Sequence, residues 1–350
     1  MASSVENPPD APETVVWGSG NPERKVGAKI GEGELATTHM IVQHTHYAPG
    51  GPLRRWMVTS TDTDQAMHVL LAMATEAIPW SGSRKMEVQV RQKKGKGSED
   101  FILVNRMYDA VRNKDKWSAG AAGGRRALPW WLTEAARGVL FVVLYFLAGC
   151  DFLPAMYNMG FKRMLHHVRM TVAMPGLFAE PIVSCSDGRW RVHTAAAVKM
   201  LCVCYFEEHV KVFEPRFPGG AADLFRSAEV AGDTRKFAHV VQDTIWTAKG
   251  AAGKKNCPRW DALELHVRRA DAVLEYWQGA LELETPRTCF EGRGWSTTDG
   301  DDSAQLTNEN VVFRLSPHAL LTQEGRVRLL KCQCKPATAA RDTNVRTAVV

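Results

Sequence analysis

The stretch RRWMVTSTDTDQAMHVLLAMATEAI, residues 54–78, changes its residue pattern halfway along. Its first part, Trp56 to Thr59, is rich in aromatic and β-branched residues and predicts a short strand. Two aspartates, Asp62 and Asp64, follow that strand at once. Beyond them, apolar residues recur at helical spacing and predict an amphipathic helix, whose stripe is formed by Met67, Leu70, Leu71, Ala74 and Ile78. The segment therefore predicts a strand, an acidic turn and a helix in immediate succession.

The segments on either side predict further alternation of strands and helices. Upstream, GEGELATTHMIVQH (31–44) begins with glycines and acidic residues, which are typical of a helix start. Downstream, MEVQV (86–90) and FILVN (101–105) flank a basic loop and predict a β-hairpin, and RMYDAV (106–111) predicts a helix. This order favours an α/β fold in which helices cover a sheet, and in such sheets sites form beyond the carboxyl ends of the strands.

Composition limits the classes of protein to consider. The 350 residues contain 45% hydrophobic and 23% charged residues, which is typical of a globular chain, and the net charge of +6 is compatible with a polyanionic partner. The N-terminal residues are polar and contain no apolar signal segment, so we expect an intracellular protein, in the nucleus or the cytoplasm, with reduced thiols. The uncharged run 138–149 is shorter than the roughly 20 residues of a membrane span, which predicts a buried core helix and no membrane association.

The residue patterns divide the chain into four segments. Residues 1–13 are predicted to be a flexible leader, 14–185 an α/β core with a helix-hairpin-like segment near 154–168, 186–283 a mainly helical domain, and 284–350 an irregular tail. Two C-x-C pairs could each supply half of a zinc site, but a structural site needs four ligands. The pair that lies in an apolar helical run is better explained by core packing; the two pairs are Cys202/Cys204 and Cys332/Cys334.

Acidic side chains stand at predicted element boundaries in three places: Glu32 and Glu34, Asp62 and Asp64, and Asp151, which follows the apolar run. Two unit charges ~4 Å apart repel by about 4 kcal/mol at an effective dielectric constant of about 20, so converging carboxylates require bound cations or raised pKa values. Such oxygen ligands suit Mg²⁺, and two ions can activate a water for phosphodiester hydrolysis. Each group also has a simpler interpretation, as a complement to a helix N-terminus, a turn or a helix cap.

Three stretches together resemble the superfamily of flap endonucleases, XPG-type repair nucleases and 5′→3′ exoribonucleases, which share a PIN-like nuclease core. They are GEGELATTHMI (31–41), VTSTDTDQAMHVLL (58–71) and FLAGCDFLPAMYNMGFKRML (146–165). The resemblance implies that residues 14–185 form the C-terminal part of such a core, an incomplete PIN-like sheet with flanking helices. It also implies two Mg²⁺ or Mn²⁺ ions and a set of ligands, of which the aspartates are catalytic: Glu32, Glu34, Asp62, Asp64 and Asp151.

The residues after Asp151 resemble the glycine-rich hairpin with which flap endonucleases grip phosphates through backbone N–H groups. Asn158 stands near its start, and asparagine tolerates the left-handed backbone almost as glycine does. The resemblance implies that Gly160, Lys162 and Arg163 contact nucleic acid. An ordinary helix start with solvated cations is the alternative interpretation.

The function that the resemblance implies is a divalent-metal-dependent nuclease homologue of the 5′ nuclease type, acting on phosphodiester bonds of RNA or DNA. The family places further catalytic aspartates before its glutamate motif, whereas only 31 residues precede Glu32 here. We therefore expect an enzyme only if the missing N-terminal part is supplied. The alternatives are a catalytically inactive nuclease-fold protein that binds nucleic acid or serves as a scaffold, and an unrelated α/β protein.

Overall fold

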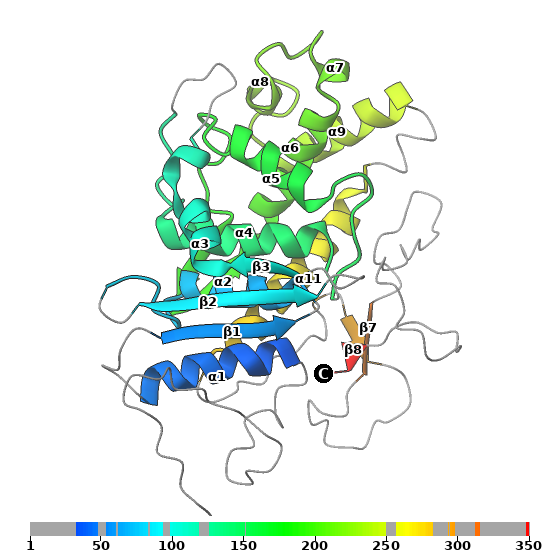
Figure 1. Ribbon diagram of the computed structural model, residues 1–350. Helices are drawn as coiled ribbons and strands as arrows, with labels where there is room; N and C mark the ends of the chain where they lie inside the picture. The colour runs from blue at the N-terminus through cyan, green and yellow to red at the C-terminus, as the bar shows by residue number, and fades with distance from the viewer. Residues whose placement is uncertain are drawn as a thin grey trace, which may run out of the picture.

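The computed structural model describes most of the chain between Gly33 and Glu282 and a few positions beyond it. The described residues are 33–47, 54–60, 62–82, 85–93, 99–118, 126–150, 152–249, 257–282, 293, 295–297, 312–315 and 348–349. The predicted leader and most of the predicted tail lie outside them. Within the described residues the fold is mixed α/β, with many helices around small sheets, as the sequence predicts at this coarse level (Figure 1).

The first sheet contains three strands in the order β1-β2-β3: β1 (Arg54–Ser60), β2 (Met86–Lys93) and β3 (Glu99–Leu103). Strand β1 runs parallel to β2, with Val58 opposite Val90. Strand β3 returns antiparallel to β2, with Leu103 opposite Gln89, which confirms the predicted hairpin. Because β1 and β2 are parallel, they end at the same edge of the sheet, and the aspartates follow β1 at that edge.

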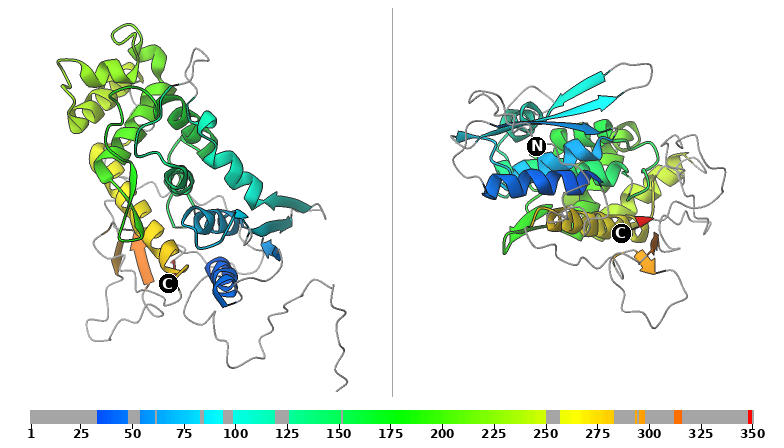
Figure 2. Two further views of the ribbon diagram at one scale, coloured as in Figure 1. Left: turned by 90° about the vertical axis from the view of Figure 1, so that its left-hand side faces the viewer. Right: turned by 60° about the horizontal axis from the view of Figure 1, so that its bottom comes forward.

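Helices cover one face of this sheet. Helices α1 (Gly33–Tyr47) and α2 (Asp64–Ala74) pack against each other beneath it, followed by α11 (Trp260–Gly279), as the right-hand view of Figure 2 shows. On the opposite face, Met57 and Phe101 are 61% and 51% exposed. The described residues therefore leave the outer face of the sheet open.

Helix α2 is buried on all sides, which differs from the amphipathic helix that its apolar stripe predicts. All eleven of its residues are buried, including Asp64, Gln65 and His68. The polar side chains are accommodated because neighbours supply partners: Gln65 donates to the Thr38 hydroxyl of α1 at 2.9 Å, and a ring nitrogen of His68 lies 2.9 Å from the Trp277 carbonyl of α11. Burial of a polar group is tolerated when it is hydrogen-bonded in this way.

Helix α4 (Glu134–Ala148) is the apolar run of the sequence, and it is a core helix as predicted. The Thr133 hydroxyl caps its first turn by accepting a hydrogen bond from the Ala136 N–H at 3.3 Å. Gly138 lets α4 approach the end of α2, since a Cβ atom there would lie 2.6 Å from the Ala74 Cβ. No helix among the described residues is long and apolar enough to cross a membrane.

The remaining elements form a mainly helical part that packs on α4 and α11. They are α3 (Val104–Arg112), the short 3₁₀ helix η4 (Lys114–Lys116), α5 (Phe161–Thr171), β4 (Val183–Ser186), β5 (Arg189–Val192), α6 (Thr194–Glu208), α7 (Val210–Phe213), α8 (Ala221–Arg226) and α9 (Thr234–Lys249). Their buried side chains join those of the first sheet in one continuous cluster from Leu35 to Leu281. Cys202 and Cys204 belong to this cluster, which agrees with their predicted packing role.

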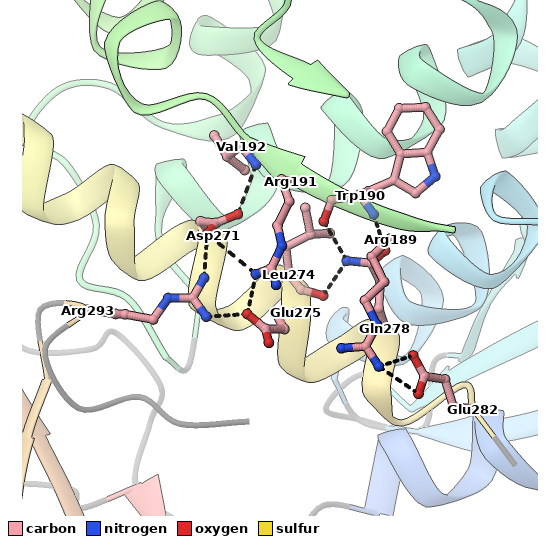
Figure 3. Close-up of polar contacts among 10 residues, drawn as sticks. All are labelled: Arg189, Trp190, Arg191, Val192, Asp271, Leu274, Glu275, Gln278, Glu282 and Arg293. Atoms are coloured by element: carbon pink, nitrogen blue, oxygen red, sulfur yellow. Dashed lines mark hydrogen bonds and ion pairs between the residues drawn. The ribbon is translucent and has the colours of Figure 1, made fainter. Parts of the chain in front are cut away.

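Polar contacts fasten the β4–β5 hairpin to α11. Figure 3 shows Asp271 and Glu275 of α11 between the guanidinium groups of Arg191 and Arg293, and all four side chains form ion pairs. The Gln278 amide bonds both backbone groups of Trp190, at 2.7 Å to its N–H and 2.9 Å to its carbonyl. Three further short strands, β6 (Trp295–Thr297), β7 (Val312–Leu315) and β8 (Ala348–Val349), form a separate antiparallel sheet.

Candidate metal centre

Asp62 and Asp64 lie where the sequence predicts them, between the end of β1 and the start of α2. The Asp62 N–H donates to the Ser60 hydroxyl at 3.0 Å, and the Asp62 carboxylate accepts the Asp64 N–H at 3.1 Å. These bonds make Asp62 a turn former, which the sequence left open as one interpretation. Asp64 is the first residue of α2 and is only 7% exposed, whereas Asp62 is half-buried.

Tyr145 of α4 completes the surroundings of Asp64. Its hydroxyl donates a short hydrogen bond to Oδ1 of the Asp64 carboxylate. Burial raises the pKa of Tyr145 above its ordinary value, and the negative charge of Asp64 raises it further, so the phenol stays protonated. Cys150 and Asp62 act on Tyr145 electrostatically in the same direction. The C-terminal end of α4 therefore lies beside the two aspartates.

The start of α1 lies beside the start of α2. Glu34 is in the first turn of α1 and is half-buried; its carbonyl accepts the Thr38 hydroxyl at 3.1 Å, and that hydroxyl accepts the Gln65 amide. The backbone of Glu34 also raises the pKa of His68, although burial outweighs this effect and lowers that pKa to about 4. Three segments that are far apart in the sequence thus meet around the first turns of α2.

The described carboxylates do not by themselves form a metal cluster. Among the residues that the structure describes, no group of three or more His, Cys, Asp or Glu side chains is arranged to hold a metal ion, and this includes Glu34, Asp62 and Asp64. Glu32 and Asp151 lie outside the described residues. Cys150 and Leu153, which lie on either side of position 151, exchange backbone hydrogen bonds of 3.0 and 3.2 Å.

The predicted nucleic-acid contacts lie at the N-terminus of α5. Asn158 has the left-handed backbone that the sequence suggested, with φ at 54°. Gly160 and Lys162 are exposed, and an added Cβ at Gly160 would meet no atom within 4 Å. Arg163 instead turns back into the protein, donating to the Asn158 carbonyl at 2.8 Å and pairing with Glu208 at 2.9 Å. Arg163 therefore supports the shape of this turn, and Lys162 is the cation that α5 presents at its start.

Tyr145 was not singled out by the sequence, yet its hydroxyl donates a hydrogen bond to the Asp64 carboxylate. A signal was present: in the run from Gly138 to Ala148, Tyr145 carries the only polar side-chain atom. A lone hydroxyl in an otherwise hydrocarbon helix requires a partner when it is buried. The pattern could not say which partner, because that depends on how α4 packs against α2.

The site is thus a buried aspartate at a strand end, an adjoining half-buried aspartate, and a tyrosine from a third segment. Comparison of the chain with protein-family models, with curated proteins and with solved structures finds no match in any of the three.

Proposed function

We propose that this chain is a divalent-metal-dependent nuclease homologue with a PIN-like core, acting on phosphodiester bonds of RNA or DNA. One observation carries the proposal: the start of α1, the end of β1 and the end of α4 meet around the first turns of α2, where Thr38 contacts Gln65 and Tyr145 contacts Asp64. These are the three segments that contain the acidic motifs of the sequence. Asp64 is also buried at the edge where two parallel strands end, and this is the edge at which α/β sheets form their sites.

The donor chemistry at this edge fits a hard divalent cation. Carboxylate oxygens are the ligands that Mg²⁺ and Mn²⁺ take in proteins, usually together with water and substrate phosphate. In this proposal Asp62, Asp64 and Asp151 are the catalytic ligands, and Glu32 and Glu34 complete the set. Two bound ions would supply an activated water and charge stabilisation for the leaving oxygen.

The start of α5 supplies the proposed contact with the nucleic-acid backbone. Gly160 and Lys162 are exposed there, and the turn before them is held by the bonds of Arg163 to Asn158 and Glu208. A lysine ammonium beside open backbone is suited to a phosphate as a point charge. We assign to Arg163 the support of this turn rather than a contact with phosphate.

The test is a cleavage assay on the full chain. The protein is incubated with end-labelled single-stranded RNA and with flap DNA in Mg²⁺ or Mn²⁺, and compared with the Asp64→Asn and Asp151→Asn variants. Loss of a metal-binding carboxylate is expected to lower the cleavage rate by more than about 100-fold. Asp243→Asn, which neutralises an exposed carboxylate on α9, is the matched control and is expected to cut like the wild type. Cleavage that survives both changes would contradict the assignment.

A second function is favoured by a specific observation. One carboxylate oxygen of Asp62 and one of Asp64 already accept hydrogen bonds from the protein, from the Asp64 N–H and from the Tyr145 hydroxyl. A pair satisfied in this way suits a non-catalytic nuclease-fold protein that binds nucleic acid or serves as a scaffold. In the same assay, such a protein would bind RNA or DNA with a steep dependence on salt and would cut neither.

A further inference from the structure

The outer face of the first sheet carries two complete rows of side chains across its three strands. Successive side chains of a strand point to opposite faces, so residues that alternate with the buried Val58, Val88 and Val90 share the outer face. The strand pairing sets the rows: Met57, Gln89 and Leu103 form one, and Thr59, Arg91 and Phe101 form the next. In the right-hand view of Figure 2, α1, α2 and α11 lie on the other side of the sheet.

Phe101 places an aromatic ring on this face beside polar side chains. The residue is 51% exposed, its cross-strand neighbour is Arg91, and Gln89 stands on the diagonal, within reach of a large side chain. A flat base that stacks on such a ring removes apolar surface from water, and every base has a face that can stack. The amide of Gln89 has both donors and an acceptor for the edge of an unpaired base.

The charges described on this face are mostly positive. The Glu87 carboxylate pairs with two cations, 3.0 Å from the Arg55 Nε and 3.7 Å from the Lys85 Nζ, and Arg91 adds a third cation to the face. The whole chain also has a net charge of +6. A second copy of this face would bring the same cations together, whereas the phosphates of a nucleic acid carry the complementary charge. The charges therefore favour a polyanion over a copy of this chain.

We propose that the outer face of the first sheet binds single-stranded nucleic acid, with an unpaired base stacked on Phe101, its edge beside Gln89 and a phosphate beside Arg91. A duplex keeps its bases stacked inside the helix, so a ring on an open sheet selects single strands. This inference does not rest on the proposed cleavage, because the contact involves none of the acidic motifs. A chain that cuts nothing can bind in this way.

The experiment measures the affinity of the full chain for a fluorescent single-stranded oligothymidylate, by anisotropy in EDTA, which prevents metal-dependent cleavage. Phe101→Leu keeps an apolar side chain but removes the ring, and it is expected to weaken binding by about 5- to 150-fold, the loss typical of one stacked base. Phe101→Trp retains a ring and is expected to bind at least as tightly as the wild type. Trp130→Leu, which removes a 78% exposed ring from the segment before α4, is the matched control and is expected to bind like the wild type.

Two further measurements separate stacking from attraction between charges. Arg91→Gln is expected to lower the slope of log affinity against log salt concentration by about 0.7, the value for one phosphate of a single strand. Phe101→Leu is expected to leave that slope unchanged. Inorganic polyphosphate has charges but no bases, so its affinity is expected to be the same for Phe101→Leu and the wild type. An equal loss of polyphosphate affinity in Phe101→Leu would show that no base stacks on the ring.

Three outcomes overturn the inference and leave the cleavage assay to decide the proposed function. The first is a wild type that does not bind the oligothymidylate in EDTA, or binds a duplex of the same length equally well. The second is a Phe101→Leu variant that binds within twofold of the wild type. The third is a dimer of the wild type that Phe101→Leu dissociates, measured by analytical ultracentrifugation, because a second copy would then cover the face.

A measurement on the wild-type chain does not depend on the folding of any variant. An oligonucleotide that contains 5-iododeoxyuridine is bound in EDTA and irradiated, so that the base forms a cross-link to a ring on which it stacks. Mass spectrometry of the digested protein is expected to find the cross-link on the peptide that contains Phe101. If the cross-links are confined to other peptides, the bases stack elsewhere and the inference is overturned.

Discussion

Gly149 ends α4 with a backbone conformation that few other residues adopt. Its φ is 112°, and a Cβ atom at this position would lie 2.5 Å from the Cα of Ala155. The chain after α4 folds back against its own helix end, so a side chain at 149 would collide with backbone that has little freedom to move. The turn at the end of α4 therefore depends on glycine for two separate reasons.

Gly149→Ala is expected to destabilise the protein more than an alanine at another left-handed glycine. Gly188 in the β4–β5 turn has φ at 76° and open space where its Cβ would be, so Gly188→Ala costs only the backbone strain, about 1–2 kcal/mol. Gly149→Ala adds overpacking against Ala155, which typically costs a further 1–3 kcal/mol, roughly. Urea unfolding of both variants measures the difference, and equal losses would show that the turn relaxes without cost.

At the level of single residues, the sequence located the acidic turn but not its environment. A strand followed at once by Asp62 and Asp64 is a local pattern, and the structure has it. The partner of Asp64 depends on the packing of α4 against α2, which no local pattern contains, so Tyr145 was missed. Whether the carboxylates bind metal stays a prediction, and two of the five lie outside the described residues.

Among the elements, the β4–β5 hairpin shows how a distant helix can stabilise a short pair of strands. Each strand has only four residues, and hairpins of this size are marginally stable alone. Side chains of α11 extend the ladder: Asp271 accepts the Val192 N–H at 2.9 Å, and Gln278 bonds both backbone groups of Trp190. The amide of Gln278 thus occupies the place of a neighbouring strand.

Gln278→Ala is expected to cost more stability than loss of the ion pair beside it. The change leaves the backbone N–H and carbonyl of Trp190 without the Gln278 amide as partner. Loss of a partner lowers the free energy of unfolding by about 1–3 kcal/mol for a buried group, and by less where water can reach the group. Glu282→Gln removes the 3.1 Å pair with Arg189, in which both side chains are well exposed, and this costs below about 1 kcal/mol. Chemical denaturation of the two variants decides the order. A larger loss in Glu282→Gln would mean that the ion pair, rather than the amide, holds the hairpin.

The elements that the sequence predicted are those with a strong internal period. Strand β1, the β2–β3 hairpin and helix α4 appear where the residue patterns place them, and residues 186–282 are mainly helical as predicted. The β4–β5 hairpin was not predicted, because its residues VSCS and RWRV carry weak strand signals and its partners lie some 80–90 positions away. The open outer face of the first sheet could not be read from periodicity either, since Met57 and Phe101 have the apolar character of covered residues.

For the whole molecule, two buried histidines make stability depend on pH. A ring nitrogen of His68 lies 2.9 Å from the Trp277 carbonyl, and one of His266 lies 2.9 Å from the Leu147 carbonyl. Burial lowers the pKa of each to about 4, from an ordinary value of 6.5. Between these values the unfolded chain binds protons that the folded chain does not, so the free energy of unfolding falls as the pH falls from about 6.5 to about 4.

The expected slope is up to about 1.4 kcal/mol per pH unit for each histidine. Urea unfolding at a series of pH values measures it, and His68→Gln, which keeps an N–H donor for the Trp277 carbonyl, is expected to reduce the slope by about one proton. Glu275 affects the free energy of unfolding at lower pH. Burial raises the pKa of Glu275, but its bonds to Arg191 and Arg293 outweigh this effect, so the pKa is lowered from its ordinary value of 4.5. The stability that the ionised Glu275 contributes is therefore lost only as the pH falls below about 4.5. If the stability of His68→Gln depends on pH above 5 as steeply as that of the wild type, His68 is not a source of this pH dependence.

The contacts of α11 also bear on how the chain is made. His39 of α1 reaches the Ala280 carbonyl across 241 positions, and His68 of α2 reaches Trp277 across 209. On the ribosome, α1 and α2 therefore emerge long before the residues of α11 that bond their histidines are synthesised. We expect the nascent chain to form a loosely collapsed intermediate, and to reach native packing only after α11 has been synthesised. Native contacts between such distant positions form slowly. During that interval the chain would be a client for chaperones.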